Sequence, residues 1–364
     1  MIPFIDLESQ QKQIREELDL AISKVLNHGK YIMGPEVGEL EERLAAYTGA
    51  KHCIAVSSGT DSLLIAMMAL GIGPGDDVIT VPYTWISTAE TISLLGARPV
   101  FVDIEEDTWN MSPQLLEEAI TENTKCIMPV GIYGQTANLK EINKIALKFG
   151  NIPVIEDAAQ CFGATHHGIR SCALSTVGST SFFPSKPLGC YGDGGALFTD
   201  DDELAESMRQ IRVHGQSLKH HHPILGLNGR LDTIQAAILL IKLKIFDHEV
   251  AQRQKVAKNY NTHLKLSGGH SLPYISNENT SVYAQYTLVS EEKQDLSLRL
   301  RDKKIPFVSY YQVPLHLQPV FSYLNYKEGD FPTSEHISSN GISLPMSPWL
   351  QATHQQKVIE AINS

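Results

Sequence analysis

A single lysine, Lys186, stands between an apolar run and a glycine-rich segment, in the sequence GSTSFFPSKPLGCYGDGGA (178–196). The β-branched and aromatic residues before it, Val177–Phe183, predict a buried strand. Pro184 and Pro187 restrict the backbone on both sides of the lysine and end that strand. Desolvation next to apolar residues favours the neutral amine, which is the form that attacks a carbonyl. Although most lysines are solvated surface residues, this setting favours a lysine that binds an aldehyde cofactor, pyridoxal 5'-phosphate (PLP).

A carboxylate precedes this lysine in the segment NIPVIEDAAQ (151–160). The apolar residues Ile152–Ile155 predict a strand, and Asp157 follows its end, where ligands bind in α/β sheets. A carboxylate beside the pyridine nitrogen of PLP keeps that nitrogen protonated, so that the ring can accept electrons. We therefore expect Asp157 to have this catalytic role and Gln160 to donate a hydrogen bond to the phenolic oxygen of the cofactor. The alternative is that Asp157 only caps the next segment.

Two earlier segments add candidates for cofactor binding. Ser58 comes before a predicted helix, Thr60–Leu70, and the free N–H groups at a helix start attract a phosphate. We assign Gly59 and Thr60 to the cofactor phosphate, because glycine permits close approach, although a simple helix cap would have the same sequence. Trp85 follows another predicted strand and offers an aromatic face that could stack on the pyridine ring. Its alternative is a partly buried core position.

The elements that must position these side chains follow an alternating pattern. Short Val- and Ile-rich runs alternate with helical patterns from residue 53 to residue 155, which predicts parallel strands joined by right-handed crossovers. Apolar periodicity predicts two helices before them, at 7–28 and at about Val37–Tyr47. The pattern therefore predicts an α/β fold with a mostly parallel central sheet.

The alternation weakens after residue 250, where a strand at Ala284–Ser290 and a helix at Leu296–Lys303 are predicted. We expect a large domain at 1–245, which includes the N-terminal helices, and a smaller C-terminal α+β domain at 246–364. No proline-rich linker marks the boundary between them.

Composition excludes several classes of function. The net charge of −11 and the isoelectric point of about 5.7 argue against a protein that binds nucleic acid or a membrane surface. The N-terminus shows no export signal, and no apolar run is long enough to span a membrane. The five cysteines are odd in number and form no CxxC pair, so we expect reduced thiols in a cytoplasmic protein without a metal site. The adjacent histidines His220–His222 are interpreted as part of a solvated loop.

Five segments, in this order, resemble the DegT/StrS-type nucleotide-sugar aminotransferases, a branch of the fold-type I PLP enzymes. The segments are SSGTDSL (57–63), PYTWISTA (82–89), EDAAQ (156–160), GSTSFFPSKPLGCYGDGG (178–195) and GLNGRLDTIQAAIL (226–239). The resemblance covers essentially the whole chain. It implies the three-layer fold of the fold-type I PLP transferases, and it adds the Ser181 hydroxyl as a further contact to the cofactor phosphate.

The resemblance also implies a homodimer with shared active sites. The segment that contains GLNGR crosses the dimer interface in this family, which places Asn228 at the cofactor phosphate of the other subunit. Arg230 would then face the substrate, where its fork suits a carboxylate or a phosphate. The alternative for Arg230 is a solvated or interfacial charge.

Three tyrosines are substrate-contact candidates by the same resemblance: Tyr31, Tyr310 and Tyr311. Tyr31 lies in a turn that is near the active site in the family, and the two later tyrosines lie in a segment that closes over the nucleotide sugar. Many relatives have histidine at the position of Tyr310, which leaves the identity of the sugar open.

The activity implied by the resemblance is the transfer of an amino group from L-glutamate to a nucleotide-linked keto-sugar. The stretch from Val213 to Leu239 is most similar to the subgroup acting on UDP-2-acetamido-2-deoxy-3-oxo-glucuronate, whose product feeds surface polysaccharide such as the O-antigen of lipopolysaccharide. A UDP- or dTDP-linked keto-6-deoxy sugar is the alternative substrate. A sugar dehydratase of the family would carry histidine at the position of Lys186. A non-catalytic PLP-fold regulatory protein would not need the complete set Lys186, Asp157, Gln160 and Ser181.

Overall fold

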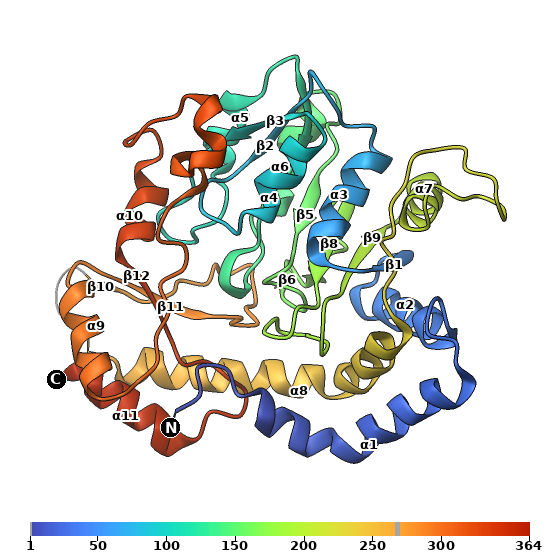
Figure 1. The fold of residues 1–364 in the computed structure, drawn as a ribbon. Coiled ribbons are helices and arrows are strands. Elements are labelled where there is room, and N and C mark those ends of the chain that lie inside the picture. Colours follow the sequence, from blue (N-terminus) through green and yellow to red (C-terminus); the bar gives the residue numbers. More distant parts are fainter. Residues whose placement is uncertain (1, 266–269) are drawn as a thin grey trace.

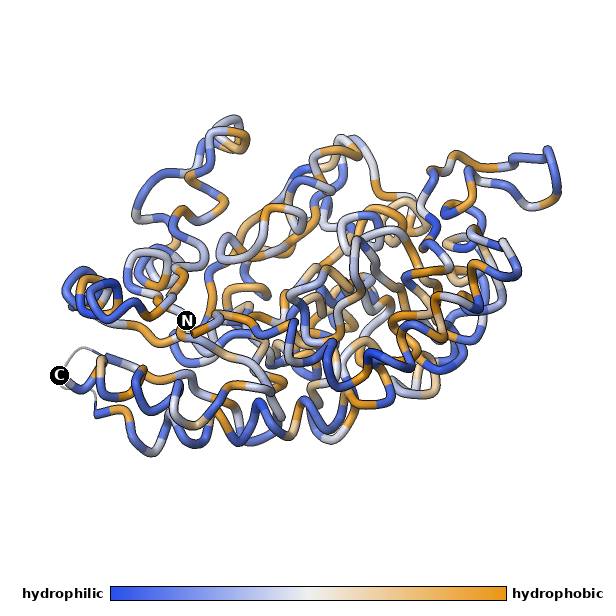
Figure 2. The backbone as a smooth tube through the Cα atoms, turned by 60° about the horizontal axis from the view of Figure 1, so that its bottom comes forward, coloured by the Kyte–Doolittle hydropathy of each residue, from blue (hydrophilic) through white to orange (hydrophobic). Residues whose placement is uncertain are grey.

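A computed structural model describes residues 2–265 and 270–364 (Figure 1). None of the helices in these ranges is long and apolar enough to cross a membrane. A long helix, α8 (Thr233–His263), runs along one side of the molecule, and α1 (Leu7–His28) packs beside it. Hydrophilic and hydrophobic turns alternate along these outer helices (Figure 2), as expected for helices that bury one face.

The central sheet of the described chain has two hydrogen-bonded groups of strands, in the orders β1-β9-β8-β5 and β3-β2-β4. Two parallel bridges, Ile127–Val154 and Val130–Asp157, join the groups between β4 and β5. The strands are β1 (His52–Val56), β2 (Asp77–Thr80), β3 (Arg98–Phe101), β4 (Thr124–Ile127), β5 (Ile155–Asp157), β8 (Val177–Ser181) and β9 (Gly195–Thr199). The pairs β2–β3, β2–β4 and β5–β8 are parallel, as predicted from the alternation.

Strand β9 is the exception, because it runs antiparallel to both β1 and β8. The sequence analysis did not predict this strand, since Gly195 and Ala196 give it little β-branched character at its start. The antiparallel pair has a local consequence for the candidate lysine. The loop 182–194, which carries Lys186, connects β8 to β9 and is anchored at both ends in the centre of the sheet.

Helices cover both faces of this part of the sheet. Ile54, Val56 and Leu197 pack in a cluster with α3 and α7, whereas the alternate residues Ala55 and Phe198 pack with α2 and α8. The helices of this region are α2 (Pro35–Thr48), α3 (Gly59–Ala69), α4 (Ser87–Leu94), α5 (Pro113–Ala119), α6 (Leu139–Lys148) and α7 (Asp202–Arg212). Helical periodicity in the sequence predicts a helix near each of them, at Val37–Tyr47, Thr60–Leu70, Ile86–Leu95, Pro113–Ile120, Leu139–Phe149 and Asp201–Val213, and each prediction is right to within a few residues.

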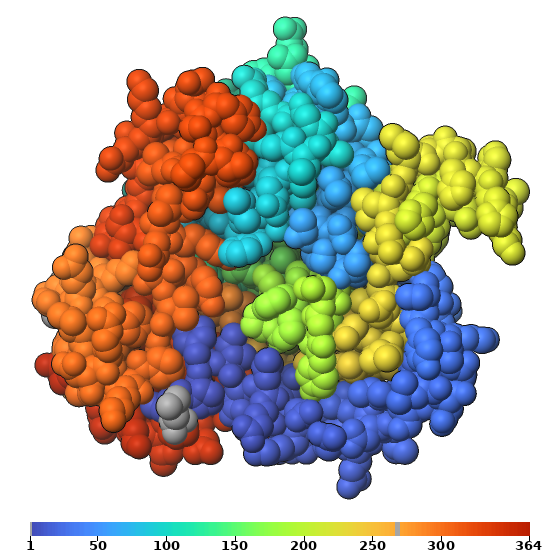
Figure 3. Space-filling view, in the orientation of Figure 1, coloured from blue at the N-terminus to red at the C-terminus, as the bar shows by residue number. Residues whose placement is uncertain are grey.

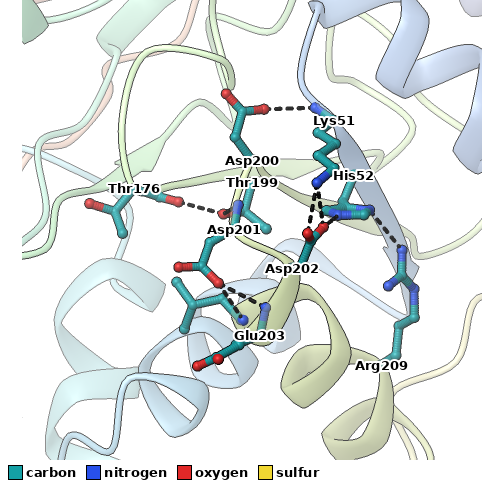
Figure 4. Close-up of polar contacts among 10 residues, drawn as sticks. Lys51, His52, Thr176, Thr199, Asp200, Asp201, Asp202, Glu203 and Arg209 are labelled. Atoms are coloured by element: carbon teal, nitrogen blue, oxygen red, sulfur yellow. Dashed lines mark hydrogen bonds and ion pairs between the residues drawn. The ribbon is translucent and has the colours of Figure 1, made fainter.

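Polar contacts fix the junction of β1, β9 and α7 (Figure 4). The Lys51 N–H donates to Asp200 at 2.7 Å, and the Lys51 ammonium and the His52 ring both contact Asp202, at 2.7 and 2.6 Å. Asp201 caps α7 by accepting from two backbone N–H groups of its first turn. The Thr199 hydroxyl donates to the Thr176 carbonyl, which ties the end of β9 to the segment that precedes β8.

The C-terminal part forms a second, antiparallel sheet in the order β10-β11-β12. Its elements are β10 (His270–Ser271), β11 (Tyr286–Ser290), α9 (Lys293–Asp302), α10 (Pro332–Asn340), β12 (Gly341–Leu344) and α11 (Ala352–Asn363). One two-stranded sheet and three 3-10 helices complete the described chain: β6 (Thr165–His166) with β7 (Ile169–Arg170), and the 3-10 helices Ile132–Gly134, Leu315–Leu317 and Pro319–Leu324.

Apolar periodicity in the sequence predicts a helix at Leu231–Lys244, but α8 is longer and passes without a break through the expected boundary at residue 245. Its residue Phe246 packs in the core beside the central sheet, whereas Tyr260 packs in the core of the C-terminal part. One helix therefore serves both cores, and the division into domains at this residue stays a prediction.

Candidate active site

A cavity of about 390 Å³ opens at the carboxyl ends of β5 and β8, between the central sheet and the C-terminal part. Nine of the twelve predicted site residues line it: Gly59, Thr60, Trp85, Asp157, Gln160, Ser181, Lys186, Tyr310 and Tyr311. They come from the start of α3, the segment before α4, the ends of β5 and β8, the β8–β9 loop and the loop after α9. The fold thus brings together side chains that are as much as 252 positions apart in the sequence.

Lys186 lies in a tight turn of the β8–β9 loop, in which its N–H donates to the Phe183 carbonyl at 2.8 Å. The same turn needs a glycine at position 189, because a Cβ there would come within 2.6 Å of the Phe183 and Pro184 carbonyl oxygens. Burial lowers the pKa of the Lys186 amine, and the negative charge of Asp157 opposes that shift. The neutral amine is therefore more populated than for a solvated lysine, which is what attack on a carbonyl needs.

Asp157, the last residue of β5, is 6% exposed, and both of its oxygens are hydrogen-bonded. The Thr88 hydroxyl donates to one oxygen at 3.0 Å, and the Ala159 N–H donates to the other at 3.1 Å. Burial raises the pKa of this carboxyl group, while the two hydrogen bonds and Lys186 lower it. A cation beside it would favour the ionised form further.

Gln160 is held at both ends of its amide. Its oxygen accepts from the Tyr133 N–H at 3.1 Å, and its nitrogen donates to the Tyr311 hydroxyl at 3.1 Å. Tyr133 has a positive φ of 54°, which is rare for a bulky residue and indicates a backbone held in place by its surroundings. One N–H of the Gln160 amide remains for another acceptor in the cavity.

The start of α3 forms a small polar cradle. The N–H groups of Gly59 and Thr60 have no acceptor within the described ranges, and the Thr60 hydroxyl contacts the Ser87 hydroxyl at 2.7 Å. Ser181 faces Gly59 so closely that a Cβ on Gly59 would lie 2.6 Å from the Ser181 Cβ. Two free backbone donors and three hydroxyl groups in one place suit a phosphate.

Aromatic side chains form the outer part of the cavity. Trp85 lines it while remaining 57% exposed, and its ring lies 6.2 Å from that of Tyr311. The Tyr310 carbonyl accepts from the buried Tyr83 and Tyr133 hydroxyls, at 2.6 and 2.9 Å. These two bonds fasten the tyrosine pair of the C-terminal part to the central-sheet side of the cavity.

Three predicted site residues do not line this cavity. Tyr31 is 47% exposed in the turn between α1 and α2. Asn228 is exposed and pairs with Val213, and Arg230 is partly buried and pairs with Val56. The Arg230 Nε is buried without a hydrogen-bond partner in the described ranges. The loop 214–229, which contains Asn228 and ends just before Arg230, stands away from the body of the molecule (Figure 3).

Comparisons with known proteins identify the family. The model of the DegT/DnrJ/EryC1/StrS aminotransferase family matches residues 12–363. The UDP-2-acetamido-2-deoxy-3-oxo-D-glucuronate aminotransferase of Pseudomonas aeruginosa is 52% identical over 364 residues, which is 100% of both chains.

The chain belongs to this family. A crystal structure of a family aminotransferase from Brucella abortus has a TM-score of 0.95 and 42% identity, and covers 100% of this chain and 98% of the other. The structure of NtdA from Bacillus subtilis, with the cofactor PMP bound, has a TM-score of 0.89 and 31% identity. The match covers 95% of this chain and 80% of the other.

The residues of this aminotransferase cavity fit a phosphorylated pyridine aldehyde on three observations. The start of α3 offers N–H donors that meet no acceptor among the described residues, Asp157 offers a buried carboxylate, and Lys186 offers a partly desolvated amine. Each matches a different part of such a cofactor: its phosphate, its ring nitrogen and its aldehyde.

The sequence analysis missed four residues at this site. Ser87 and Thr88 lie inside the segment PYTWISTA, so the signal was present but only Trp85 was interpreted. Tyr133 contacts Gln160, and Gln285 lines the cavity. No local sequence pattern marks either residue, because only the tertiary fold brings them to the site.

Proposed function

We propose that this protein is a PLP-dependent aminotransferase that moves an amino group from L-glutamate to a nucleotide-linked keto-sugar. The observation that carries the proposal is the meeting of Lys186, Asp157 and the free start of α3 in one cavity. Its fold is then the three-layer, type I fold of PLP enzymes, with a large domain at 1–245 and a smaller one at 246–364. The full-length match to family members supports this architecture.

Each residue has a defined task in this proposal. PLP, when bound, supplies an aldehyde and an electron-accepting ring. Lys186 holds it covalently between turnovers and, once its amine is free, moves a proton from the α-carbon of the donor. Asp157 keeps the ring nitrogen protonated, and Gln160 donates to the phenolic oxygen. Gly59, Thr60, Ser181 and Ser87 would hold the phosphate, and Trp85 would stack on the ring.

We further propose UDP-2-acetamido-2-deoxy-3-oxo-glucuronate as the amino acceptor. The 52% identity to the P. aeruginosa enzyme over the full length supports this choice. Arg230 is proposed to bind the carboxylate of the uronic acid, for which its fork is suited. Tyr31, Tyr310 and Tyr311 are proposed as further contacts to the nucleotide sugar. The product would enter surface polysaccharide synthesis, including O-antigen, from the cytoplasm.

A panel assay tests the activity. Loading with PLP should give an absorption band at roughly 410–430 nm, as expected of the bound cofactor. The loaded protein is then offered L-glutamate with UDP-2-acetamido-2-deoxy-3-oxo-glucuronate, with UDP-linked and dTDP-linked keto-6-deoxy sugars, or with no sugar, and 2-oxoglutarate is measured. Sustained 2-oxoglutarate release only with the uronate supports the proposal. Preference for a keto-6-deoxy sugar would overturn the substrate, and absence of the band would overturn the cofactor.

We propose that the active unit is a homodimer with shared sites. The loop 214–229 projects from the body and carries exposed apolar side chains, among them Leu218 and Leu225, which is 88% exposed. Such side chains at the end of a projecting loop suit a contact with a second copy. In the dimer, Asn228 would contact the partner's cofactor phosphate and Arg230 the partner's substrate.

Co-expression of Lys186→Ala and Arg230→Ala chains with different tags tests the shared site. If one site takes its lysine from one chain and its arginine from the other, a mixed dimer keeps one intact site. Random assembly then restores about a quarter of wild-type activity, because about half of the dimers are mixed and each has one good site of two. Tag-purified mixed dimers without activity would rule out sharing.

A further inference from the structure

Among the described residues, one buried side-chain oxygen of a residue that lines the active-site cavity has no hydrogen-bond partner. The side-chain oxygen of Gln285 is buried and, within the described ranges, accepts no hydrogen bond, although Gln285 lines the cavity beside the tyrosines of the C-terminal part. Buried polar atoms in folded proteins almost always have a partner. An exception inside a binding cavity indicates an atom that a ligand satisfies.

The position of Gln285 is fixed by its neighbours. It precedes β11, and the next side chain, Tyr286, points into the C-terminal core and donates to Asn261 at 2.5 Å. Because side chains alternate in an extended segment, Gln285 points the other way, toward the cavity. The Val282 N–H donates to the Gly134 carbonyl at 2.9 Å, which ties this segment to the turn that carries Tyr133.

Several other polar side chains of the cavity already have partners within the described residues. Asp157 accepts two hydrogen bonds, Gln160 is bonded at both ends of its amide, and the Thr60 hydroxyl contacts Ser87. Gln285 also belongs to the C-terminal part of the chain, whereas the start of α3, which suits the phosphate, belongs to the central-sheet part. Its free oxygen therefore requires a hydrogen-bond donor from something other than the protein or the cofactor phosphate.

The chemistry of the two substrates decides which of them can supply this donor. L-glutamate carries two carboxylates, which only accept hydrogen bonds, and its amine is the reacting group. A keto-sugar carries hydroxyl groups, and the proposed substrate also carries an acetamido N–H, all of which donate. On the basis of the proposed function, we infer that Gln285 is a specificity residue that accepts a hydrogen bond from a hydroxyl or amide N–H of the sugar.

The two half-reactions, followed separately by the absorption of the bound cofactor, test this inference. The first is the PLP form with L-glutamate, and the second is the amino form with UDP-2-acetamido-2-deoxy-3-oxo-glucuronate. Gln285→Met keeps the length of the side chain but removes the oxygen. It should raise the apparent KM of the second half-reaction roughly 10- to 100-fold, the range expected for a buried acceptor bond, and change the first less than about twofold.

Two further variants make the result specific. Gln285→Glu retains an acceptor of the same shape, and its KM for the sugar should lie between those of wild type and Gln285→Met. Gln254→Met is the matched control. The Gln254 side chain donates to the carbonyl of Ser281, which stands four positions before Gln285 in the same segment but outside the cavity. It should leave both half-reactions unchanged.

Three outcomes would overturn the inference. An unchanged sugar half-reaction in Gln285→Met would mean that the oxygen binds no sugar group. A loss confined to the glutamate half-reaction would mean that the amide is reversed and donates to a carboxylate. A wild-type protein that reacts with glutamate but with no nucleotide keto-sugar would refute the proposed function, and the role of Gln285 with it.

Discussion

The two sides of the cavity are built differently. On the sheet side, Asp157, Ser181 and the start of α3 stand at the ends of regular elements, and Asp157 is held by hydrogen bonds from Thr88 in the adjoining helix α4 and from the Ala159 N–H. On the C-terminal side, Tyr310, Tyr311 and Gln285 lie outside helices and strands, and two tyrosine hydroxyls on the Tyr310 carbonyl connect them to the sheet side.

This difference corresponds to two different tasks. A cofactor that remains bound through every turnover needs groups fixed in advance, and strand and helix ends provide such positions. A substrate that enters and leaves needs polar groups that are satisfied only when it is present, as the free oxygen of Gln285 is. We therefore expect changes on the sheet side to affect both substrates, and changes on the C-terminal side to affect mainly the sugar.

The largest effect is expected from Lys186→Ala, which should abolish turnover with either substrate. The variant loses the amine that holds the cofactor and moves the proton, while the remaining sheet-side contacts still allow PLP to bind. Borohydride reduction of the loaded wild-type protein, followed by peptide mass mapping, should place the cofactor on Lys186. A label on any other lysine would refute the assignment.

Asp157→Asn should keep the fold but slow both half-reactions by about two to three orders of magnitude, since each ~1.4 kcal/mol lost in the transition state costs tenfold. The fold should persist because asparagine keeps the shape of the side chain: its oxygen can accept from the Ala159 N–H, and its amide nitrogen can donate to the Thr88 hydroxyl, which can turn to accept. Single-turnover rates with L-glutamate measure the effect. Rates near wild type would indicate that another group protonates the ring.

Gly59→Ala should weaken PLP binding by about tenfold or more, because the new methyl group would overlap the Ser181 side chain and push the start of α3 away from β8. Titration of the unloaded protein with PLP gives the dissociation constant. Gly38→Ala is the matched control, since a Cβ at Gly38 meets nothing within 4 Å. Equal affinities for the two variants would contradict a close approach at Gly59.

The sequence predicted the sheet side better than the C-terminal side for a physical reason. Lys186, Asp157 and Gly59 lie where a local pattern changes from strand to loop or from loop to helix, so a short stretch is enough to find them. Gln285 and Tyr133 owe their positions to contacts between segments about 150 residues apart, which no short stretch contains. The length of α8 was underestimated because its apolar stripe passes from one core to another between Phe246 and Tyr260.

A smaller effect on substrate binding is expected from Tyr83→Phe. Tyr83 is one of the two tyrosines whose hydroxyls connect the C-terminal side of the cavity to the sheet side. The variant loses one of the two donors to the Tyr310 carbonyl, and Tyr133 retains the other. We expect the KM for the sugar to rise about three- to tenfold, and the KM for glutamate to change less, because one neutral hydrogen bond contributes about 1 kcal/mol. Tyr326→Phe, whose hydroxyl accepts from the Phe101 N–H outside the cavity, is the control. Equal changes in both KM values would refute a selective link.

The smallest effect concerns Glu156, which neighbours Asp157 on β5 but points into the core rather than the cavity. It accepts from the Cys172 N–H at 2.7 Å, and burial raises the pKa of its carboxyl group to about 8. Because the folded state then binds a proton that the unfolded state releases near pH 4.5, the stability of the protein should fall as the pH rises between these two values.

Glu156→Gln cannot ionise and should lose less stability over that window. Between pH 6 and 8 the melting temperature of wild type should therefore fall a few degrees further than that of the variant, since one pKa unit corresponds to about 1.4 kcal/mol. Both half-reaction rates should stay close to wild type, because the side chain does not reach the cavity. Glu118→Gln, at an exposed position of α5, is the control, and its melting temperature should change with pH as that of wild type does. If the melting temperature of Glu156→Gln falls with pH as far as that of wild type, then Glu156 is ionised in the folded protein. The contrast between Glu156 in the core and Asp157 in the cavity would then be wrong.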